Sequence, residues 1–227
     1  MQLLDFFNAR INDQQPDLEH SEQLWDRRAD EVSRFVVGAD DFALHMLGQH
    51  LSFDGKRVLE ISFGGGRHLL EFLRRGASVC GVEISANMIA HTRRKLDEAG
   101  LQCPPQDLVQ SSWEALQLSE HGWENAFDLV FLYMSPALSS TAMLDKALAT
   151  TRQGLYMALY SHREDSLLHE LQTEFELPHV PVGSQRADDL YDLFNALYQR
   201  GFFPELRFEE RCKTTSYEPD YIFERYA

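Results

Sequence analysis

The chain lacks the long apolar run that a membrane-spanning helix needs. None of its 227 residues lies in a stretch that approaches the roughly 18 to 20 consecutive apolar residues that cross a bilayer. The first residues, MQLLDFFNARINDQQ, also lack the basic start, apolar run and small-residue cleavage site of a secretory signal. We therefore expect a cytoplasmic protein with no membrane partner.

Basic residues are also scarce. The 21 Lys and Arg residues stand against 36 Asp and Glu residues, which gives a formal net charge of −15 at pH 7. A field this negative repels phosphate backbones, because their binding depends on Lys and Arg that displace counterions. Extended nucleic acid is therefore not an expected partner.

Cysteine is rare, and histidine forms no metal-binding pattern. Cys80, Cys103 and Cys212 are scattered, with no C-x-x-C pair and an odd count, which argues against a disulfide framework. The nine histidines form no H-E-x-x-H motif and pair with no cysteine at zinc-like spacing. We expect reduced thiols and no metal.

What the sequence does contain is an alternation of strand and helix patterns. The first fifty residues read as helical, with an apolar stripe over residues 22–36 and Asp40 or Asp41 as cap of a second helix. Strands are then predicted at 57–61, 78–83, 108–109, 127–133 and 154–160, with helices at 67–75, 85–99 and 141–151 between them. Strands separated by helices imply parallel crossovers in a doubly wound α/β sheet.

The last third of the chain is predicted to add two helices and two strands. Residues 164–176 and 187–199 look helical, and extended segments at about 205–212 and 220–226 could pair antiparallel at the sheet edge. The expected total is a mainly parallel, seven-stranded sheet within one domain, 1–227. Its expected parts are 1–51 (helical), 52–163 (core), 164–200 (helical) and 201–227 (strand pair).

A glycine cluster follows the first predicted strand. Glycines 64–66 form a turn that lets the backbone approach a ligand, and the amides at the following helix start favour electronegative groups. A dinucleotide fingerprint would need a small residue where Leu69 stands, and no glycine-lysine-serine/threonine marks a phosphate loop. A tight turn without any ligand stays an alternative.

An acid stands at the end of the second predicted strand. Glu83 follows Glu60 by 23 residues, where a carboxylate can accept hydrogen bonds from both hydroxyls of a ribose. Together with the glycine turn it indicates a nucleoside site, whereas alone it would be read as a solvated charge.

Residues 57–160 resemble the core of the class I S-adenosylmethionine (SAM)-dependent methyltransferases, a Rossmann-like family. The segment Glu60-Ile-Ser-Phe-Gly-Gly-Gly66 is similar to the family's acidic and glycine-rich motif, with Ser62 in place of the first glycine. Val82-Glu-Ile-Ser-Ala-Asn-Met88 is similar to its second-strand motif. The cofactor-binding residues that the resemblance implies are Glu60, Ser62, Phe63, Gly64, Gly65, Gly66, Glu83, Ile84, Met88, Ser112, Trp113 and Met134.

Ser112 is a departure from the family pattern. It stands after the third strand at the position of the acid that faces adenine, and its hydroxyl can still hydrogen-bond the adenine amine. Trp113 could contact the adenine through its backbone amide or ring, or could be a packed loop aromatic.

The resemblance also indicates the acceptor side. Met134-Ser-Pro-Ala137 lacks the Asp/Asn-Pro-Pro-Tyr/Phe motif of the members that methylate base amino groups. The segment around Trp25 resembles the lid helix of small-molecule members, with a buried helix aromatic as the alternative. Candidate catalytic residues are Tyr133 and His162, and candidate substrate-pocket residues are Trp25, Arg28, Ser135 and Arg163.

The implied activity is methyl transfer from SAM to a small molecule by direct displacement. Two alternatives remain open. One is a SAM-binding regulatory or partner protein without catalysis, an alternative that Ser62 and Ser112 keep open. The other is a nicotinamide-dependent oxidoreductase, which shares the sheet and the strand-end acid but is opposed by the glycine spacing.

Overall fold

The computed structural model describes residues 3–11, 17–38, 40–161, 164–176, 189–212 and 214. The chain divides into two compact units, 1–159 and 160–227, and each is described by itself. The boundary lies close to the one expected between the core and the second helical segment. The single domain over 1–227 stays a prediction.

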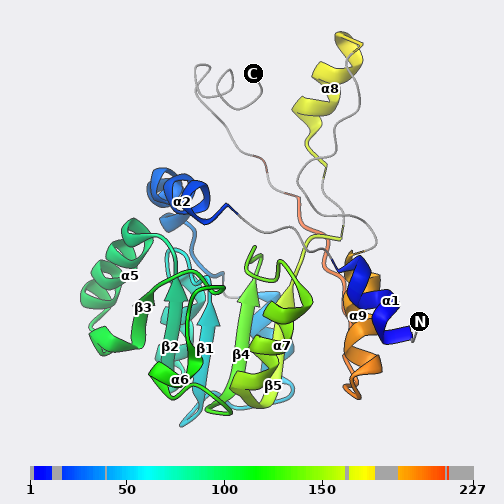
Figure 1. The fold of residues 1–227 in the computed structure, drawn as a ribbon. Coiled ribbons are helices and arrows are strands. Elements are labelled where there is room, and N and C mark those ends of the chain that lie inside the picture. The colour runs from blue at the N-terminus through cyan, green and yellow to red at the C-terminus, as the bar shows by residue number, and fades with distance from the viewer. Residues whose placement is uncertain are drawn as a thin grey trace. The chain divides into compact units, whose positions relative to one another are not determined.

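The first unit is built on a parallel sheet of five strands in the order β3-β2-β1-β4-β5 (Figure 1). All four neighbouring pairs run parallel, as the alternation of strands and helices predicts. The strands are β1 (Arg57–Ile61), β2 (Ser78–Glu83), β3 (Leu108–Gln110), β4 (Phe127–Tyr133) and β5 (Thr151–Ala158).

The central strand β1 and its neighbour β4 are buried along most of their length. Residues 58–61 of β1 and 129–132 of β4 are buried, since helices cover both faces of the sheet. In register, Leu59 stands between Cys80 of β2 and Val130 of β4. The continuous apolar run of β4 is therefore explained by a central position.

Two apolar layers hold the helices on the sheet. One layer joins α3 (Phe42–Gly48), α4 (Arg67–Arg74) and α5 (Ala86–Ala99) to one face, with Phe72 and Phe131 among its buried members. The other joins α7 (Thr141–Thr150) and the residues around α6 (Leu118–His121) to the opposite face, with Trp123 and Phe127 inside. The unit also contains α1 (Leu3–Arg10), α2 (Leu18–Ser33) and the short 3-10 helix η1 (Pro105–Asp107).

Polar side chains cap the first turns of α3 and α5, and a glycine ends α5. Asp41 accepts a hydrogen bond from the Leu44 amide at the start of α3, and Ser85 accepts one from the Met88 amide at the start of α5. Gly100 ends α5 with a left-handed φ of 65°. These caps are as predicted. Helix α2, however, spans 18–33 rather than 22–36, because Asp17 caps it and the helix begins four residues before the apolar stripe.

The second unit contains α8 (Ser166–Glu174) and α9 (Asp189–Gln199), within the two helical segments that the sequence predicts. The strand expected at 205–212 is not seen, because these residues are irregular. A strand needs a neighbour to satisfy its backbone groups, and the expected partner at 220–226 lies outside the described residues. The antiparallel edge pair is therefore not seen, and the described sheet has five strands rather than seven.

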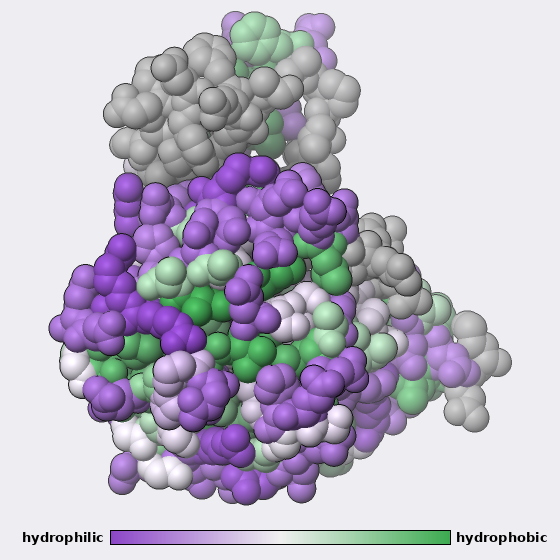
Figure 2. All heavy atoms as spheres, turned by 60° about the vertical axis from the view of Figure 1, so that its left-hand side comes forward, coloured by the Kyte–Doolittle hydropathy of each residue, from purple (hydrophilic) through white to green (hydrophobic). Residues whose placement is uncertain are grey.

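Figure 2 brings the side of the molecule that carries α2 and α5 toward the viewer. Hydrophilic residues dominate the visible surface, as expected from the excess of acidic side chains, and apolar surface forms a band across the middle of this face. Among the helices of the described residues, none is both long enough and apolar enough to cross a membrane.

Candidate functional site

The candidate site lies at the edge of the sheet where β1 to β4 end. Figure 1 shows α2 above the tips of β1 and β2, so this helix covers the edge at which open parallel sheets bind ligands. Two adjoining cavities lie there, of ≈ 340 and ≈ 50 Å³. Leu18, Ile84, Ser111 and Ser112 line both of them.

The glycine turn is closely covered by other parts of the chain. A Cβ at Gly65 would lie 2.7 Å from the Cα of Ser33 in α2, and a Cβ at Gly66 would lie 2.5 Å from Cγ2 of Thr92 in α5. Gly64 and Gly66 also have φ angles of +54° and +73°, in the left-handed region. Ser62, where the family has glycine, has a φ of +58°. The turn thus needs glycine for close packing as well as for conformation.

Glu60 is a buried acid at the end of β1. Burial raises its pKa to about 8, against the lowering effect of the nearby Arg67 guanidinium. Its Oε2 atom is buried and has no hydrogen-bond partner in the part of the chain that the structure describes. A buried polar atom without a partner is costly, so Glu60 is suited to receive a hydrogen-bonding group from a ligand.

Glu83 is buried and holds the two loops together. Its Oε2 accepts from the amide of Gly64 at 2.8 Å, and its Oε1 accepts from the amide of Ser85 at 3.0 Å. Burial raises its pKa, and these backbone hydrogen bonds oppose the rise. The amide of Ile84 contributes a third backbone hydrogen bond, so about one of the four acceptor positions of the carboxylate remains for the ribose hydroxyls expected from the sequence.

Two expected cofactor residues belong to the core instead of the cavity walls. Phe63 is buried, and its ring fills the space that a Cβ at Gly81 would take, 2.5 Å from the ring's Cδ1. Met88 is buried in the first turn of α5, where its amide donates to Ser85. Neither lines a cavity, because their strand-end and helix-start positions point them inward.

The loop after β3 forms the opposite wall. Ser112, Trp113 and Glu114 line the smaller cavity together with Ser62. Trp113 is 3% exposed, its Nε1 donates to the carbonyl of Met143 at 3.2 Å, and Lys146 lies 4.8 Å from its ring centroid. Trp113 is therefore a packed loop aromatic, the second of the two readings, with one part of its surface on the cavity.

Lys146 of α7 fastens this loop from behind. Its Nζ donates to the carbonyls of Trp113, at 2.5 Å, and of Leu116. Ser112 adds a local bond, because its Oγ accepts from the amide of Ala115 at 3.1 Å. The wall is therefore a braced loop whose polar groups are largely used within the protein.

The end of β4 carries the candidate catalytic Tyr133. The His68 ring centroid lies 4.5 Å from its ring, and the Arg67 guanidinium carbon lies 4.5 Å from it. His68 is buried, and its Nε2 lies 3.5 Å from Oδ2 of Asp41. The structure thus surrounds Tyr133 with ionisable side chains that the sequence does not single out.

Met134 and Ser135 follow Tyr133 but do not line either cavity. Met134 has a φ of +50°, and its amide donates to the carbonyl of Ala158. Ser135 is buried, and its Oγ accepts from the amide of Ala137. The next residues, Pro136 and Ala137, are the ones that contribute to the smaller cavity.

Trp25 and Arg28 lie on α2. Trp25 lines the smaller cavity, and its role as part of a lid stays a prediction. Arg28 does not line a cavity: its guanidinium carbon lies 5.3 Å from the Trp25 ring centroid, and its Nε donates to Glu31 at 3.4 Å. His162 and Arg163, the other two expected residues, lie outside the described residues.

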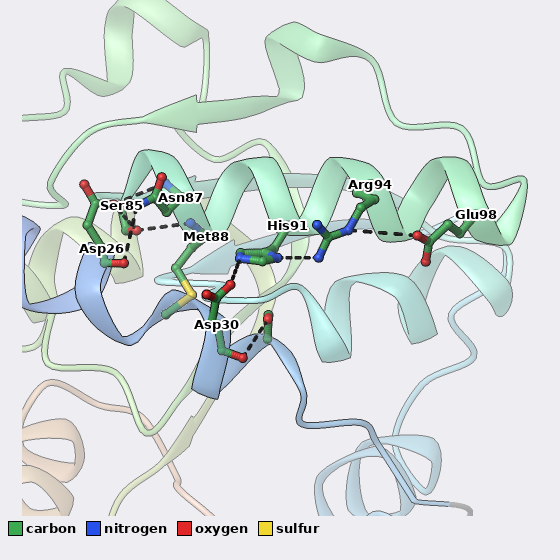
Figure 3. A network of polar contacts seen from close by, with 9 residues as sticks. Asp26, Asp30, Ser85, Asn87, Met88, His91, Arg94 and Glu98 are labelled. Carbon is green, nitrogen blue, oxygen red and sulfur yellow. Dashed lines mark hydrogen bonds and ion pairs between the residues drawn. The ribbon is translucent and has the colours of Figure 1, made fainter. Parts of the chain in front are cut away.

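Carboxylates fasten α2 to α5 (Figure 3). Oδ1 of Asp26 accepts from the hydroxyl of Ser85 at 2.5 Å and from the amide of Asn87 at 3.1 Å. Asp30 pairs with Nε2 of His91 at 2.9 Å, and Nδ1 of His91 lies 2.6 Å from Arg94. The covering helix is therefore attached to the helix that follows Glu83.

Sequence reasoning missed several residues that line the cavities. They are Leu18, Glu19, Ser21 and Glu22 of α2, Val82 of β2, Gln110, Ser111 and Glu114 of β3 and its loop, and Pro136 and Ala137. A usable signal existed for α2, because positions 18, 21, 22 and 25 share one helix face at spacings of three and four. Within the described residues, no group of three His, Cys, Asp or Glu could hold a metal ion.

Comparison with protein families gives one match. Residues 58–156 match the family described as "Methyltransferase domain". This range begins in β1 and ends in β5, so it contains the glycine turn, Glu83 and the loop after β3.

Individual relatives agree with this match. The Ubiquinone biosynthesis O-methyltransferase of Nitrosococcus oceani is 30% identical over 124 residues, which cover 54% of this chain and 50% of that protein. The match therefore spans half the length of this relative.

Two solved structures share the fold. Magnesium protoporphyrin IX methyltransferase from Synechocystis PCC 6803, with bound S-adenosylhomocysteine (SAH), is 17% identical over 88% of both chains at a TM-score of 0.51. The DhpI-SAM-HEP complex is 19% identical over 83% of this chain and 91% of that one, also at 0.51.

Proposed function

We propose that this chain, whose residues 58–156 belong to the methyltransferase domain family, binds SAM and transfers its methyl group to a small molecule. The observation that carries the proposal is the pair of cavities under α2, which are lined by Ile84, the residue after Glu83, and by the loop after β3. Nucleoside cofactors bind at this edge of doubly wound sheets.

The residues present fit the cofactor from end to end. Ser62, Ile84 and Ser112 line the cavity beside the glycine turn, where an adenosine would lie between β2 and β3. The remaining acceptor position of Glu83 serves the ribose hydroxyls. The unpartnered Oε2 of Glu60 suits the ammonium group of the methionine portion, because an ion pair there would satisfy a buried acid.

When bound, SAM would supply a sulfonium-activated methyl carbon to which an acceptor atom can bond directly, while the carbon–sulfur bond breaks and SAH leaves. The task of the protein is to hold the acceptor in line with that carbon and to exclude water. We assign the exclusion of water to α2, through Trp25 and the attachment of Asp26 to α5. Tyr133, at the end of β4 beside Arg67 and His68, is the proposed group for handling an acceptor proton.

The acceptor is proposed to be a small molecule in the cytoplasm. The name of the Nitrosococcus relative supports a small-molecule acceptor, and a net charge of −15 opposes binding to nucleic acid. The seven-stranded form of the sheet also remains part of the proposal. Leu206 and Phe208 alternate with Glu205, Arg207 and Glu209, a pattern suited to an edge strand.

Ligand-dependent unfolding temperatures test the proposal. SAM and SAH at a hundred times their dissociation constants add about 2.7 kcal/mol to the free energy of unfolding, whereas NADH adds nothing. A shift with NADH alone would show a nicotinamide enzyme. Transfer of radiolabelled methyl to a panel of hydroxyl, amine and thiol acceptors then separates an enzyme from a binding protein, because only an enzyme converts SAM to SAH with an acceptor.

A further inference from the structure

The larger cavity has one wall that the family motifs do not describe. Gln110, Ser111 and Ser112 form its side at the end of β3, and Leu18, Glu19 and Glu22 of α2 form the side facing them. Ile84, the residue after Glu83, completes the lining. The cavity therefore continues from the ribose position into a space between β3 and α2.

The β3 side of this cavity is short of acceptors for an amine. Ser111 donates its hydroxyl proton to the carbonyl of Ser112 at 2.9 Å, and the hydroxyl oxygen of Ser112 already accepts from the Ala115 amide. No carboxylate stands at position 112. An exocyclic amine placed here, with two N–H donors, would lack a charged acceptor on this wall.

The α2 side supplies a carboxylate. Glu22 is half-buried, lines the cavity and makes no hydrogen bond or ion pair with the described residues. It lies four residues after Leu18 and three before Trp25, on the face of α2 that lines the cavities. Glu19 differs, since it is exposed and accepts a hydrogen bond from Nε2 of Gln23 at 3.4 Å.

We propose that Glu22 recognises the cofactor by accepting a hydrogen bond from the exocyclic amine of adenine. The carboxylate thus comes from the covering helix and replaces the acid that is absent at Ser112, while Ile84 offers an apolar surface to the purine ring. This inference rests on the proposed function, because it assumes that the cavities bind SAM.

The role predicts a specific base preference. An amine donates to a carboxylate, whereas the 6-oxo group of hypoxanthine is an acceptor that a carboxylate repels. The protein should therefore bind SAH much more tightly than S-inosylhomocysteine, which differs at this position. Removal of the Glu22 carboxylate should reduce the preference for SAH, because it removes both the attraction to the adenine amine and the repulsion of the 6-oxo group.

Calorimetric titration of both nucleosides into the wild-type protein, Glu22→Ala, Glu22→Gln and, as a control for the loss of one exposed carboxylate outside both cavities, Glu98→Ala tests the inference. We expect Glu22→Ala to bind SAH about tenfold more weakly and to lose most of the preference over S-inosylhomocysteine, the scale of one charge-assisted hydrogen bond. The affinity of Glu22→Gln should fall between those of the wild type and Glu22→Ala, and Glu98→Ala should match the wild type. Unfolding temperatures of the unliganded variants check that α2 is intact.

The outcomes separate two failures. A wild-type protein that binds neither nucleoside overturns the proposed function and this inference with it. A wild-type protein that binds SAH while Glu22→Ala keeps both the affinity and the base preference overturns the role of Glu22 alone. A variant that binds SAH normally but has a raised KM for the acceptor would instead assign Glu22 to the acceptor, and would equally overturn it.

Discussion

The glycine turn and the loop after β3 lie at the same edge of one sheet but are built in different ways. In the turn, the amide of Gly64 is held by Glu83, and Gly65 lies against the backbone of Ser33. The loop after β3 is braced from behind by Lys146 and leaves open space in front of Ser112. The space around the glycine turn is therefore filled by packed atoms, whereas the loop after β3 borders an open cavity.

This comparison distinguishes residues that build the site from residues that line the space for a ligand. The residues most recognisable in the sequence are largely occupied with forming the turn and attaching α2. The open space is lined by side chains such as Ser111 and Glu22, whose types carry no signature. The recognisable residues thus fix where a ligand lies, and the others decide what it contacts.

Gly66→Ala, in the packed glycine turn, should lower the stability of the protein more than the other substitutions. The new Cβ would lie 2.5 Å from Cγ2 of the buried Thr92, whose hydroxyl donates to the carbonyl of Gly64, and φ is +73°. Left-handed strain and overpacking together should lower the free energy of unfolding by about 3–4 kcal/mol. Urea denaturation measures the loss.

Gly100→Ala is the matched control for that substitution. Its φ is +65°, but no atom lies within 4 Å of the added Cβ. It should therefore lose only the strain, about 1 kcal/mol. Equal losses in the two variants would show that packing does not close the turn.

Glu60→Gln should remove a pH dependence of stability. The pKa of Glu60 is about 8 in the folded protein against 4.5 for an ordinary glutamate, so the folded state holds its proton more tightly. Wild-type stability should therefore fall as pH rises from about 4.5 through 8, by about 5 kcal/mol over the whole range. Urea denaturation from pH 5 to 8.5 should find this slope reduced in the variant.

The exposed acid Glu98 provides a control for the loss of one carboxylate. Glu98→Gln should keep the wild-type pH slope, because its side chain is 69% exposed. A slope that persists in Glu60→Gln would assign the pH dependence to other groups. Saturating SAM should also flatten the slope if its ammonium pairs with Glu60.

Asp26→Ala should loosen the covering helix. The substitution removes the acceptor for the hydroxyl of Ser85 and the amide of Asn87, which should lower the free energy of unfolding by about 1–2 kcal/mol. Hydrogen exchange should rise throughout α2. Asp30→Ala, which removes a carboxylate that is 82% exposed, should cost under about 1 kcal/mol, and an equal effect would contradict a special role for Asp26.

Ser62→Gly should have the smallest effect and the opposite sign. Its φ of +58° strains a serine but not a glycine, so the variant should gain about 0.5 kcal/mol in thermal unfolding. Asn125→Gly, at a φ of +47°, should gain less, because asparagine tolerates this conformation. A loss of stability in Ser62→Gly would show that the serine side chain stabilises the turn.

The sequence predicts the sheet well because its signals are local. The apolar run of β4, the cap at Ser85 and the left-handed glycine after α5 each depend on a few neighbouring residues. The strand expected at 205–212 does not follow from local signals in this way, since a strand forms only when a partner pairs with it.

The residues of the candidate site also differ in whether local sequence patterns could predict their positions. Glu60, Glu83 and the glycines stand at strand ends, which sequence patterns locate, whereas Phe63 and Met88 turn into the core for reasons that only packing decides. The contribution of Glu22 depends on α2 crossing over β3, a long-range contact. Helical spacing from Trp25 identifies the face of α2 on which Glu22 lies, but it does not identify the residues that this face contacts.

The attachment of α2 to α5 also gives the protein an internal reporter. The amide of Asn87 donates to Asp26 only while α2 covers the sheet edge. Its NMR shift and solvent exchange would therefore follow each departure of α2, without a label in the cavity. If a nucleoside can enter only after that departure, the opening rate read at this one amide is the ceiling for the rate of ligand entry.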